Sequence, residues 1–266
     1  MSRRRLDNEL VRRGLAASRT EAQAAIREGK VVVAGSPAAK ASTLVDPAAP
    51  VELVGAARRF VSRGGEKLDA ALERFGVDAA GRRALDAGAS TGGFTDCLLQ
   101  RGAAHVVALD VGYGQLAWAI RTDERVTVLE RTNVRELTAA HLPYAPDLVA
   151  ADLSFISLTL AVPPLAAVAA PGADLLLLVK PQFEAGPSDV GSRGVVRDPG
   201  VWRRALEAVA AACGAAELAP TAVMASPLPG PAGNVEFPMH VRKGPGPVVL
   251  DLDDAVLEGL RVAGTA

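Results

Sequence analysis

The chain has 266 residues, 49% of them hydrophobic and 22% charged, which suits one large globular domain or a small domain followed by a medium-sized one. Its two cysteines and three histidines show neither disulfide nor metal-ligand spacing, and no apolar stretch is long enough to span a membrane or form an export signal, so we expect a cytoplasmic protein without a metal site. The net charge of −1 is unevenly spread, because residues 1–67 carry 13 Lys and Arg against 7 Asp and Glu, and this basic part favours an anionic polymer as partner over a merely solvated surface.

The amino-terminal residues 1–57 are predicted to form a small α+β module. Apolar residues at helical spacing predict a helix over residues 6–15, and Ser18 followed by Glu21 has the spacing of a capping box at the start of a second helix. Strands are predicted over residues 30–33 and 51–54, with a turn over residues 35–37 after the first strand. Two helices packed on a small sheet therefore precede the main domain.

This module resembles the S4-type RNA-binding domain. The resemblance rests on Arg5-Leu6-Asp7, Leu10-Val11, Gly14-Leu15, Ser18-Arg19, Ala22, Ile26, Gly29, Val31-Val32-Val33 and Gly35. It implies that basic side chains bind an RNA backbone, whose phosphates require clustered cations. The candidates are Arg3, Arg4, Arg5, Arg12, Arg13, Arg19, Arg27, Lys30 and, in the segment that follows, Arg63.

A linker over residues 58–63 is predicted to lead into a second domain over residues 64–243. There, apolar strand patterns alternate with helical ones, which is typical of a doubly wound α/β fold with a mostly parallel, Rossmann-like sheet. The expected strands cover residues 84–87, 106–110, 126–129, 148–151, 175–180, 221–225 and 236–241, and seven strands are typical of a class I methyltransferase. Residues 244–266 are predicted to form a tail with at most one short helix.

A glycine-rich turn follows the strand over residues 84–87 and opens a helical pattern, as in α/β sheets that bind nucleotide-like ligands. Gly88, Gly92 and Gly93 are spaced Gly-x-x-x-Gly-Gly rather than Gly-x-Gly-x-x-Gly. This wider loop suits a ligand without phosphates better than a dinucleotide, which disfavours a nicotinamide-dependent dehydrogenase. Asp110 ends the next strand, where a ribose diol needs an acceptor, and its position counts against the alternative of an ordinary strand-to-helix turn.

The loop resembles motif I of the class I methyltransferases, which bind S-adenosylmethionine. The resemblance implies that Asp110 holds the ribose and Asn133 the adenine amine. The cofactor-binding candidates are Asp86, Gly88, Ala89, Ser90, Thr91, Gly92, Gly93, Phe94, Asp110 and Asn133. Four of the phenylalanines lie in sequence motifs: Phe94, Phe155, Phe183 and Phe237. At most one or two of them are expected to stack on adenine or on a splayed-out base, and the others to pack in the core.

Charged residues stand at the edges of three apolar strand patterns, at Asp152, Lys180 and Glu236. Because a buried unpaired charge is costly, we expect Asp152 to pair with Lys180, and a plain strand-end salt bridge is the alternative for each residue. Together with Lys67, the three resemble the Lys-Asp-Lys-Glu tetrad of FtsJ-type ribose 2′-O-methyltransferases. A ribose hydroxyl needs a positioned base to attack a methyl group at neutral pH. Lys180 is the candidate for this base, with Asp152 and Glu236 orienting the lysines, and the sequence leaves open which of the two lysines acts as the base.

Most of the chain resembles the TlyA family of ribosomal RNA cytidine 2′-O-methyltransferases, which are also named haemolysins. The resemblance rests on the S4-like module and on Asp-Ala-Gly-Ala-Ser-Thr-Gly-Gly-Phe-Thr, Ala-Asp-Leu-Ser-Phe-Ile-Ser-Leu, Val-Lys-Pro-Gln-Phe-Glu and Ser-Pro-Leu-Pro-Gly-Pro-Ala-Gly-Asn-Val-Glu. It implies S-adenosylmethionine-dependent methylation of 23S and, in some members, 16S ribosomal RNA, with ribosomal subunits as partners, no membrane and no obligate protein partner. Arg59 and Phe60 depart from the family's small residue and Trp in the linker, and we expect the Phe60 ring to keep the packing surface.

Two other functions compete with this one. An S4-type ribosomal RNA-binding or assembly protein with an inactive methyltransferase domain is disfavoured by the intact tetrad. A membrane-active haemolysin would need an export signal, a membrane span or a long basic amphipathic helix, none of which the sequence shows.

Overall fold

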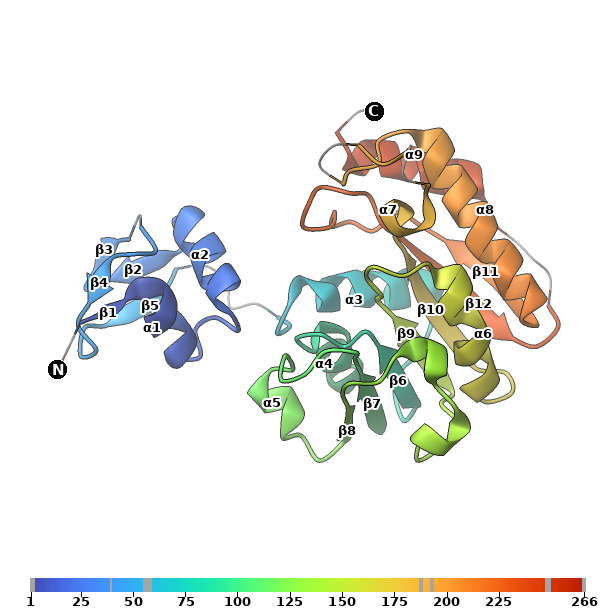
Figure 1. Ribbon diagram of the computed structural model, residues 1–266, viewed down its shortest axis with the longest axis horizontal. Helices are drawn as coiled ribbons and strands as arrows, with labels where there is room; N and C mark the ends of the chain where they lie inside the picture. The colour runs from blue at the N-terminus through green and yellow to red at the C-terminus, as the bar shows by residue number, and fades with distance from the viewer. Residues whose placement is uncertain are drawn as a thin grey trace. The chain divides into compact units, whose positions relative to one another are not determined.

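The computed structural model describes residues 3–38, 40–54, 59–186, 189–191, 194–246 and 250–264. The chain divides into two compact units, Met1–Arg59 and Phe60–Ala266 (Figure 1). This division falls inside the predicted linker, of which residue 58 lies outside the described residues, as do residues 55–57 at the end of the predicted module. Each unit has its own hydrophobic core.

The first unit packs two helices, α1 and α2, against short antiparallel strands in the part that the structure describes. Its elements are β1 (Arg4–Arg5), α1 (Leu6–Arg12), α2 (Arg19–Arg27), β2 (Val31–Val33), β3 (Ser36–Pro37), β4 (Leu44–Val45) and β5 (Val51–Leu53). Strand β1 pairs with β4, and β2 lies between β3 and β5. Leu6, Leu10 and Ile26 fill the core, and Ser18 caps α2 by accepting a hydrogen bond from the Glu21 amide, as the capping-box spacing predicts.

Some predictions for this unit were wrong in detail. Helix α1 ends at Arg12 rather than at residue 15, because Gly14 adopts a φ of +70°. The turn predicted over residues 35–37 lies at Ala34 and Gly35, which have φ values of +48° and +80°, as a two-residue type I′ hairpin requires. Strands β1 and β4 were not predicted, since two residues show no periodicity.

The second unit is the predicted α/β domain. Its elements are α3 (Arg63–Phe75), β6 (Arg83–Ala87), α4 (Gly93–Gln100), β7 (His105–Leu109), α5 (Trp118–Arg121), β8 (Val126–Leu129), the 3₁₀ turns η1 (Val134–Glu136) and η2 (Ala139–His141), β9 (Leu148–Ala151), α6 (Leu158–Val168), β10 (Asp174–Val179), α7 (Pro181–Glu184), α8 (Pro199–Ala215), β11 (Leu218–Val223), β12 (Phe237–Lys243) and α9 (Leu252–Val262). No helix within the described ranges is long and apolar enough to cross a membrane.

The seven strands form one sheet in the order β11-β12-β10-β9-β6-β7-β8. Strands β10, β9, β6, β7 and β8 are parallel, and β12 runs antiparallel to both of its neighbours, so the prediction of a mostly parallel sheet is confirmed. Helices α3 and α4 cover one face, and α6, α8 and α9 cover the other (Figure 1). Because both faces are covered, the central strands are apolar throughout, which is why they could be located from the sequence. The largest error is β11, which begins three residues before its predicted start, at a pair of strands whose register shifts after Pro220.

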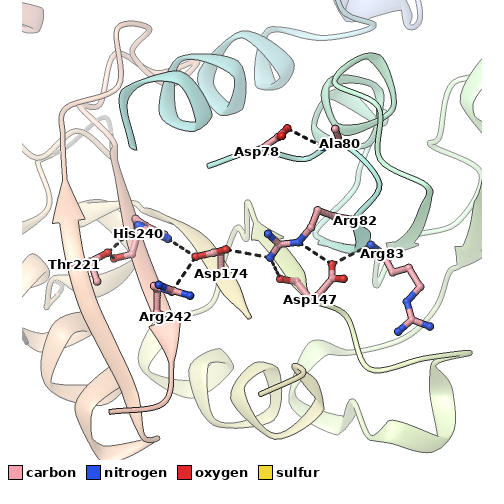
Figure 2. A network of polar contacts seen from close by, with 9 residues as sticks. All are labelled: Asp78, Ala80, Arg82, Arg83, Asp147, Asp174, Thr221, His240 and Arg242. Atoms are coloured by element: carbon pink, nitrogen blue, oxygen red, sulfur yellow. Dashed lines mark hydrogen bonds and ion pairs between the residues drawn. The ribbon is translucent and has the colours of Figure 1, made fainter. Parts of the chain in front are cut away.

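A polar network joins the amino-terminal ends of the central strands (Figure 2). Asp174 accepts hydrogen bonds from Arg82 at 3.0 Å and from His240 at 2.9 Å, while Arg82 also contacts Asp147 at 3.1 Å and His240 contacts Thr221 at 2.8 Å. Burial alone would raise the pKa of Asp174, but its hydrogen bonds to His240 and Arg82 lower it below its usual value. These hydrogen bonds and ion pairs join the neighbouring strands β11, β12, β10, β9 and β6 at the end of the sheet opposite the carboxyl-terminal ends of the parallel strands, where ligands bind in such folds.

Candidate active site

The four predicted tetrad residues meet at the carboxyl-terminal edge of the parallel strands. Asp152 follows β9 and Lys180 follows the neighbouring β10, whereas Glu236 directly precedes β12, in which Phe237 pairs with Val179. Lys67 comes from the first turns of α3, across one face of the sheet. Residues more than a hundred positions apart in the sequence are thus brought to one edge by the topology of the sheet.

The tetrad forms two ion pairs. Lys180 Nζ lies 2.6 Å from Asp152 Oδ1, which confirms the predicted pair, and it donates a hydrogen bond to Ser154 Oγ at 3.0 Å. Lys67 pairs with Glu236, and these side chains are almost fully buried, with the residues only 5% and 1% exposed. Buried ions persist in a protein only when they are paired, so Lys67 and Glu236 hold each other in a fixed place, while Lys180 is held between Asp152 and Ser154.

Gly230 and Asn234 position Glu236, and neither was singled out from the sequence. A Cβ atom at Gly230 would collide with the Glu236 carboxylate, and the Gly230 amide bonds to the carbonyl of Asn234 at 2.8 Å. The Asn234 side chain is buried and bonds to the backbone of Gly194 and Val196 at 2.8 and 2.9 Å. An asparagine two residues before the predicted Glu236 in a Gly/Pro-rich loop was the signal available in the sequence.

Glycines let three segments approach closely beside this tetrad. Gly88 and Gly92 have φ values of +90° and +95°, and a Cβ atom at position 88 would collide with the backbone oxygen of Asp152. A Cβ atom at Gly93 would collide with Ser62, and one at Gly65 would collide with Phe60. The glycine-rich loop therefore lies directly against both the Asp152 loop and the start of the helix that carries Lys67.

Asp110 joins this loop to the next one. Its Oδ2 accepts the Ser90 amide at 2.7 Å and its Oδ1 accepts the Gly112 amide at 2.6 Å. Each carboxylate oxygen can accept a second hydrogen bond, so the pair still fits the two hydroxyl groups of a ribose. Asn133 Oδ1 accepts the Arg135 amide at 3.0 Å, where it caps the 3₁₀ turn η1, and it too has a second acceptor position, which suits an adenine amine. An open glycine cradle ending in these acceptors fits S-adenosylmethionine.

Asp86 lies beneath the glycine loop and is fully buried. Thr95, in the first turn of α4, donates a hydrogen bond to Asp86 Oδ2 at 2.6 Å. Burial raises the pKa of Asp86 to about 7, although the Thr95 hydrogen bond opposes this shift. We propose that Asp86 acts on the cofactor through the loop and helix start that it supports.

Asp86→Asn is expected to reduce the pH dependence of stability. Because the folded-state pKa of about 7 lies above the ordinary carboxyl pKa of about 4, folded Asp86 keeps a proton that the unfolded chain has lost, and the stability of the fold declines as the pH rises from about 4 to about 7. The melting temperature of the wild type should therefore fall over this range more steeply than that of Asp86→Asn, as calorimetry at several pH values measures. If the melting temperatures of the two proteins fell equally with pH, the raised pKa of Asp86 would be contradicted.

The comparisons with known proteins agree with this geometry. Residues 60–243 match the FtsJ-like methyltransferases and residues 4–51 match the S4 domain. The chain is 55% identical over 244 residues, 91% of each chain, to the 16S/23S rRNA (cytidine-2′-O)-methyltransferase TlyA of Mycobacterium tuberculosis. This protein belongs to the TlyA family of FtsJ-like methyltransferases. It is an enzyme, and its cofactor is S-adenosylmethionine.

Two further proteins are similar to this chain over most of its length. The putative rRNA methyltransferase YqxC of Bacillus subtilis is 45% identical over 238 residues, 89% of this chain and 85% of its own. A solved structure of a putative hemolysin from Streptococcus thermophilus is 36% identical, covers 99% of this chain and 96% of its own, and superposes with a TM-score of 0.78. The similarity thus extends through both units.

Two buried acids organise the S4 cations of this TlyA-family chain, and the sequence did not indicate them. Asp7 accepts hydrogen bonds from Arg5 and Arg19, and Glu9 accepts them from Arg12 and Arg13. The Arg12 hydrogen bond lowers the pKa of Glu9 to about 2 in spite of burial, so the carboxylate stays charged. The remaining predicted cations also lie at the surface: Arg3, Arg4, Arg27 and Lys30 in the first unit and Arg63 in the second.

The phenylalanines divide into two groups. Phe94 and Phe237 are buried and belong to the core. Phe155 is 93% exposed, has a φ of +63°, and its ring centroid lies 5.3 Å from that of Phe183. Lys180 Nζ lies 5.9 Å from the Phe183 ring, so this pair borders the tetrad.

Within the ranges described by the structure, no group of three His, Cys, Asp or Glu side chains is placed to hold a metal ion.

Proposed function

We propose that this protein methylates the 2′-hydroxyl of a cytidine ribose in ribosomal RNA. The observation that carries the proposal is the pair of ion pairs, Lys180 with Asp152 and Lys67 with Glu236, beside a glycine loop that fits S-adenosylmethionine. The relative from Mycobacterium tuberculosis, of which this chain matches 91%, is named for this reaction on 16S and 23S RNA. We infer that the substrates are ribosomal subunits in the cytoplasm: the large subunit, through its 23S RNA, with the small subunit as an additional candidate.

Lys180 is the base in the proposed mechanism. When bound, S-adenosylmethionine supplies an electrophilic methyl group. Lys180 first releases its proton to solvent; the free amine then accepts the proton of the ribose hydroxyl, and the ammonium that results pairs with Asp152 again, 2.6 Å away. Ser154, which holds the same nitrogen, keeps it directed toward the substrate. Lys67 and Glu236 fix the opposite side of the site as a buried pair, so the hydroxyl is held in a single orientation.

The target base is proposed to stack on the exposed aromatic pair. A base inside an RNA helix cannot bring its ribose to a recessed site, so enzymes that modify nucleotides take the target out of the stack. Phe155 and Phe183 offer a ring surface beside Lys180 for such a base. The S4 unit supplies the cations that hold the surrounding RNA backbone.

Nucleoside mass spectrometry tests the proposed function. Purified protein, S-adenosylmethionine and ribosomal subunits from cells that lack the corresponding gene should yield 2′-O-methylcytidine in digested ribosomal RNA. Tight RNA binding without this nucleoside would support the alternative of an inactive S4-type assembly protein. Leakage of dye-loaded phospholipid vesicles without RNA methylation would support the haemolysin.

The S4 cations are expected to set the salt dependence of RNA binding. Arg3→Ser, Arg4→Ser and Arg27→Ser remove surface cations without separating the buried Asp7 and Glu9 from their partners. Each lost phosphate contact should lower the slope of log affinity against log salt by about one. Filter binding between low and physiological salt measures the slope, with Arg261→Ser on α9 as a control. An unchanged slope in all three variants would contradict the predicted role.

A further inference from the structure

The loop between β9 and α6, residues 152–157, carries Asp152 and Ser154 and is anchored by apolar packing through Leu153, in the core, and Ile156, which packs against the core. Ser154 and Phe155 are exposed, and Phe155 adopts a positive φ that a residue with a Cβ atom rarely takes. Such a conformation persists only when the surrounding structure fixes it. Contacts from outside the loop must therefore hold it in place.

Besides this apolar packing, two residues of one neighbouring segment provide polar contacts to the loop. At the start of the loop, Lys180 holds Asp152 at 2.6 Å and Ser154 at 3.0 Å. At its end, Glu184 Oε2 accepts a hydrogen bond from Ser157 Oγ at 2.5 Å. Lys180 directly precedes the single-turn helix α7 and Glu184 is its last residue, so one short segment contacts the loop at both ends.

Glu184 also fixes the start of helix α6. Its Oε1 accepts the Leu158 amide at 2.8 Å, while Ser157 Oγ caps the helix by accepting the Thr159 amide at 3.1 Å. Only a carboxylate offers acceptors on both oxygens for these two donors. The side chain is half-buried, and burial raises the pKa of Glu184. A carboxylate kept in such a place points to a specific role for its two acceptors.

We propose that Glu184 is a positioning residue for methyl transfer: it fixes the β9–α6 loop so that Asp152 and Ser154 hold Lys180 and Phe155 stays presented to the substrate. This inference rests on the proposed function. Glu184 does not touch the reacting atoms in this role, since its oxygens are occupied by Ser157 and Leu158. It therefore affects the rate of transfer rather than cofactor binding.

Steady-state kinetics on the full-length protein test the proposal. Glu184→Ala should lower kcat by about ten- to a hundredfold, because small displacements of catalytic groups have effects of that size, while the KM for S-adenosylmethionine stays within about twofold. Glu184→Gln keeps one acceptor oxygen, so its kcat should lie between that of the wild type and that of Glu184→Ala. Ser157→Ala should resemble Glu184→Ala, and Ser157→Thr, which retains the hydroxyl, should restore activity.

Hydrogen–deuterium exchange provides a readout that does not depend on activity. In Glu184→Ala, peptides covering residues 152–158 should exchange faster, whereas the glycine loop should not change. Asp251→Asn is the matched control, because Asp251 is also a carboxylate that accepts an amide at a helix start, in α9. It should leave both kcat and the exchange of residues 152–158 at wild-type values.

The outcomes separate this proposal from the proposed function. A wild-type kcat in Glu184→Ala and Ser157→Ala would overturn the positioning role, whether or not the loop exchanges faster. If Glu184→Ala does not fold, Glu184→Gln and Ser157→Ala decide the question by the same criterion. A wild-type protein that never methylates RNA would refute the proposed function, while faster exchange in Glu184→Ala would still show that this residue holds the loop.

Discussion

Lys180→Ala is expected to abolish methyl transfer, with a loss of about 10²- to 10⁴-fold in kcat, and to leave S-adenosylmethionine affinity almost unchanged. Lys180 is 8% exposed, and its nitrogen contacts Asp152 and Ser154 of the β9–α6 loop and lies 5.9 Å from the Phe183 ring of α7. The glycine loop and Asp110, which are proposed to bind the cofactor, do not depend on these contacts. Single-turnover methylation and calorimetric titration of the cofactor measure the two effects.

Two conservative variants separate the role of a base from that of an ion-pair partner. Lys180→Arg retains a positive charge for Asp152 but cannot accept a proton, and Lys180→Met retains the length of the side chain alone. We expect both to be as inactive as Lys180→Ala, with Lys180→Arg the most stable of the three. Turnover by Lys180→Arg at a substantial fraction of the wild-type rate would remove Lys180 from the role of base.

Glu236→Ala is expected to destabilise the fold by about 3–5 kcal/mol, because it leaves the buried ammonium of Lys67 without its partner. Replacing both members, as in Lys67→Met with Glu236→Met, should recover most of this loss, since apolar side chains of similar size often replace a buried ion pair at little cost. The double variant should nevertheless remain inactive. Urea unfolding gives the stability and the methylation assay gives the activity.

This double variant distinguishes a structural pair from a catalytic one. If it is both stable and active, Lys67 and Glu236 serve only to fill the space between α3 and β12. If Glu236→Ala unfolds at the same urea concentration as the wild type, the Lys67–Glu236 ion pair does not form in solution. The proposed positioning of the ribose hydroxyl would then lose its basis.

Much of the site was predictable from the sequence, because parallel strands buried on both faces are continuous apolar runs and the residues after them must lie at one edge. Asp152 and Lys180 were located in this way, and their pairing followed from the cost of an isolated charge. The contact of Lys67 with Glu236, 169 positions away, depends on how α3 crosses the sheet, which no local pattern encodes.

Other features were hidden because their residue types usually mean something else. Asp7 and Glu9 stand in a helix between basic residues, where acids are normally solvated, yet both are fully buried. Glu184 is the last residue of the Val-Lys-Pro-Gln-Phe-Glu motif, in which Lys180 and Pro181 indicate the end of a strand. Its partners Ser157 and Leu158 belong to a different segment. Tertiary hydrogen bonds of this kind leave no periodicity in the sequence.

The close approach of Gly88 to the backbone of Asp152 limits how this site can be altered. Even a methyl group at position 88 would displace the backbone of Asp152 and, with it, the carboxylate that pairs with Lys180. The segment that holds the cofactor and the segment that holds the base therefore cannot drift independently during evolution. If Asp110 and Asn133 bind the ribose and the adenine as proposed, an enzyme redesigned for bulkier analogues of the methyl donor has to gain its space at that end of the site.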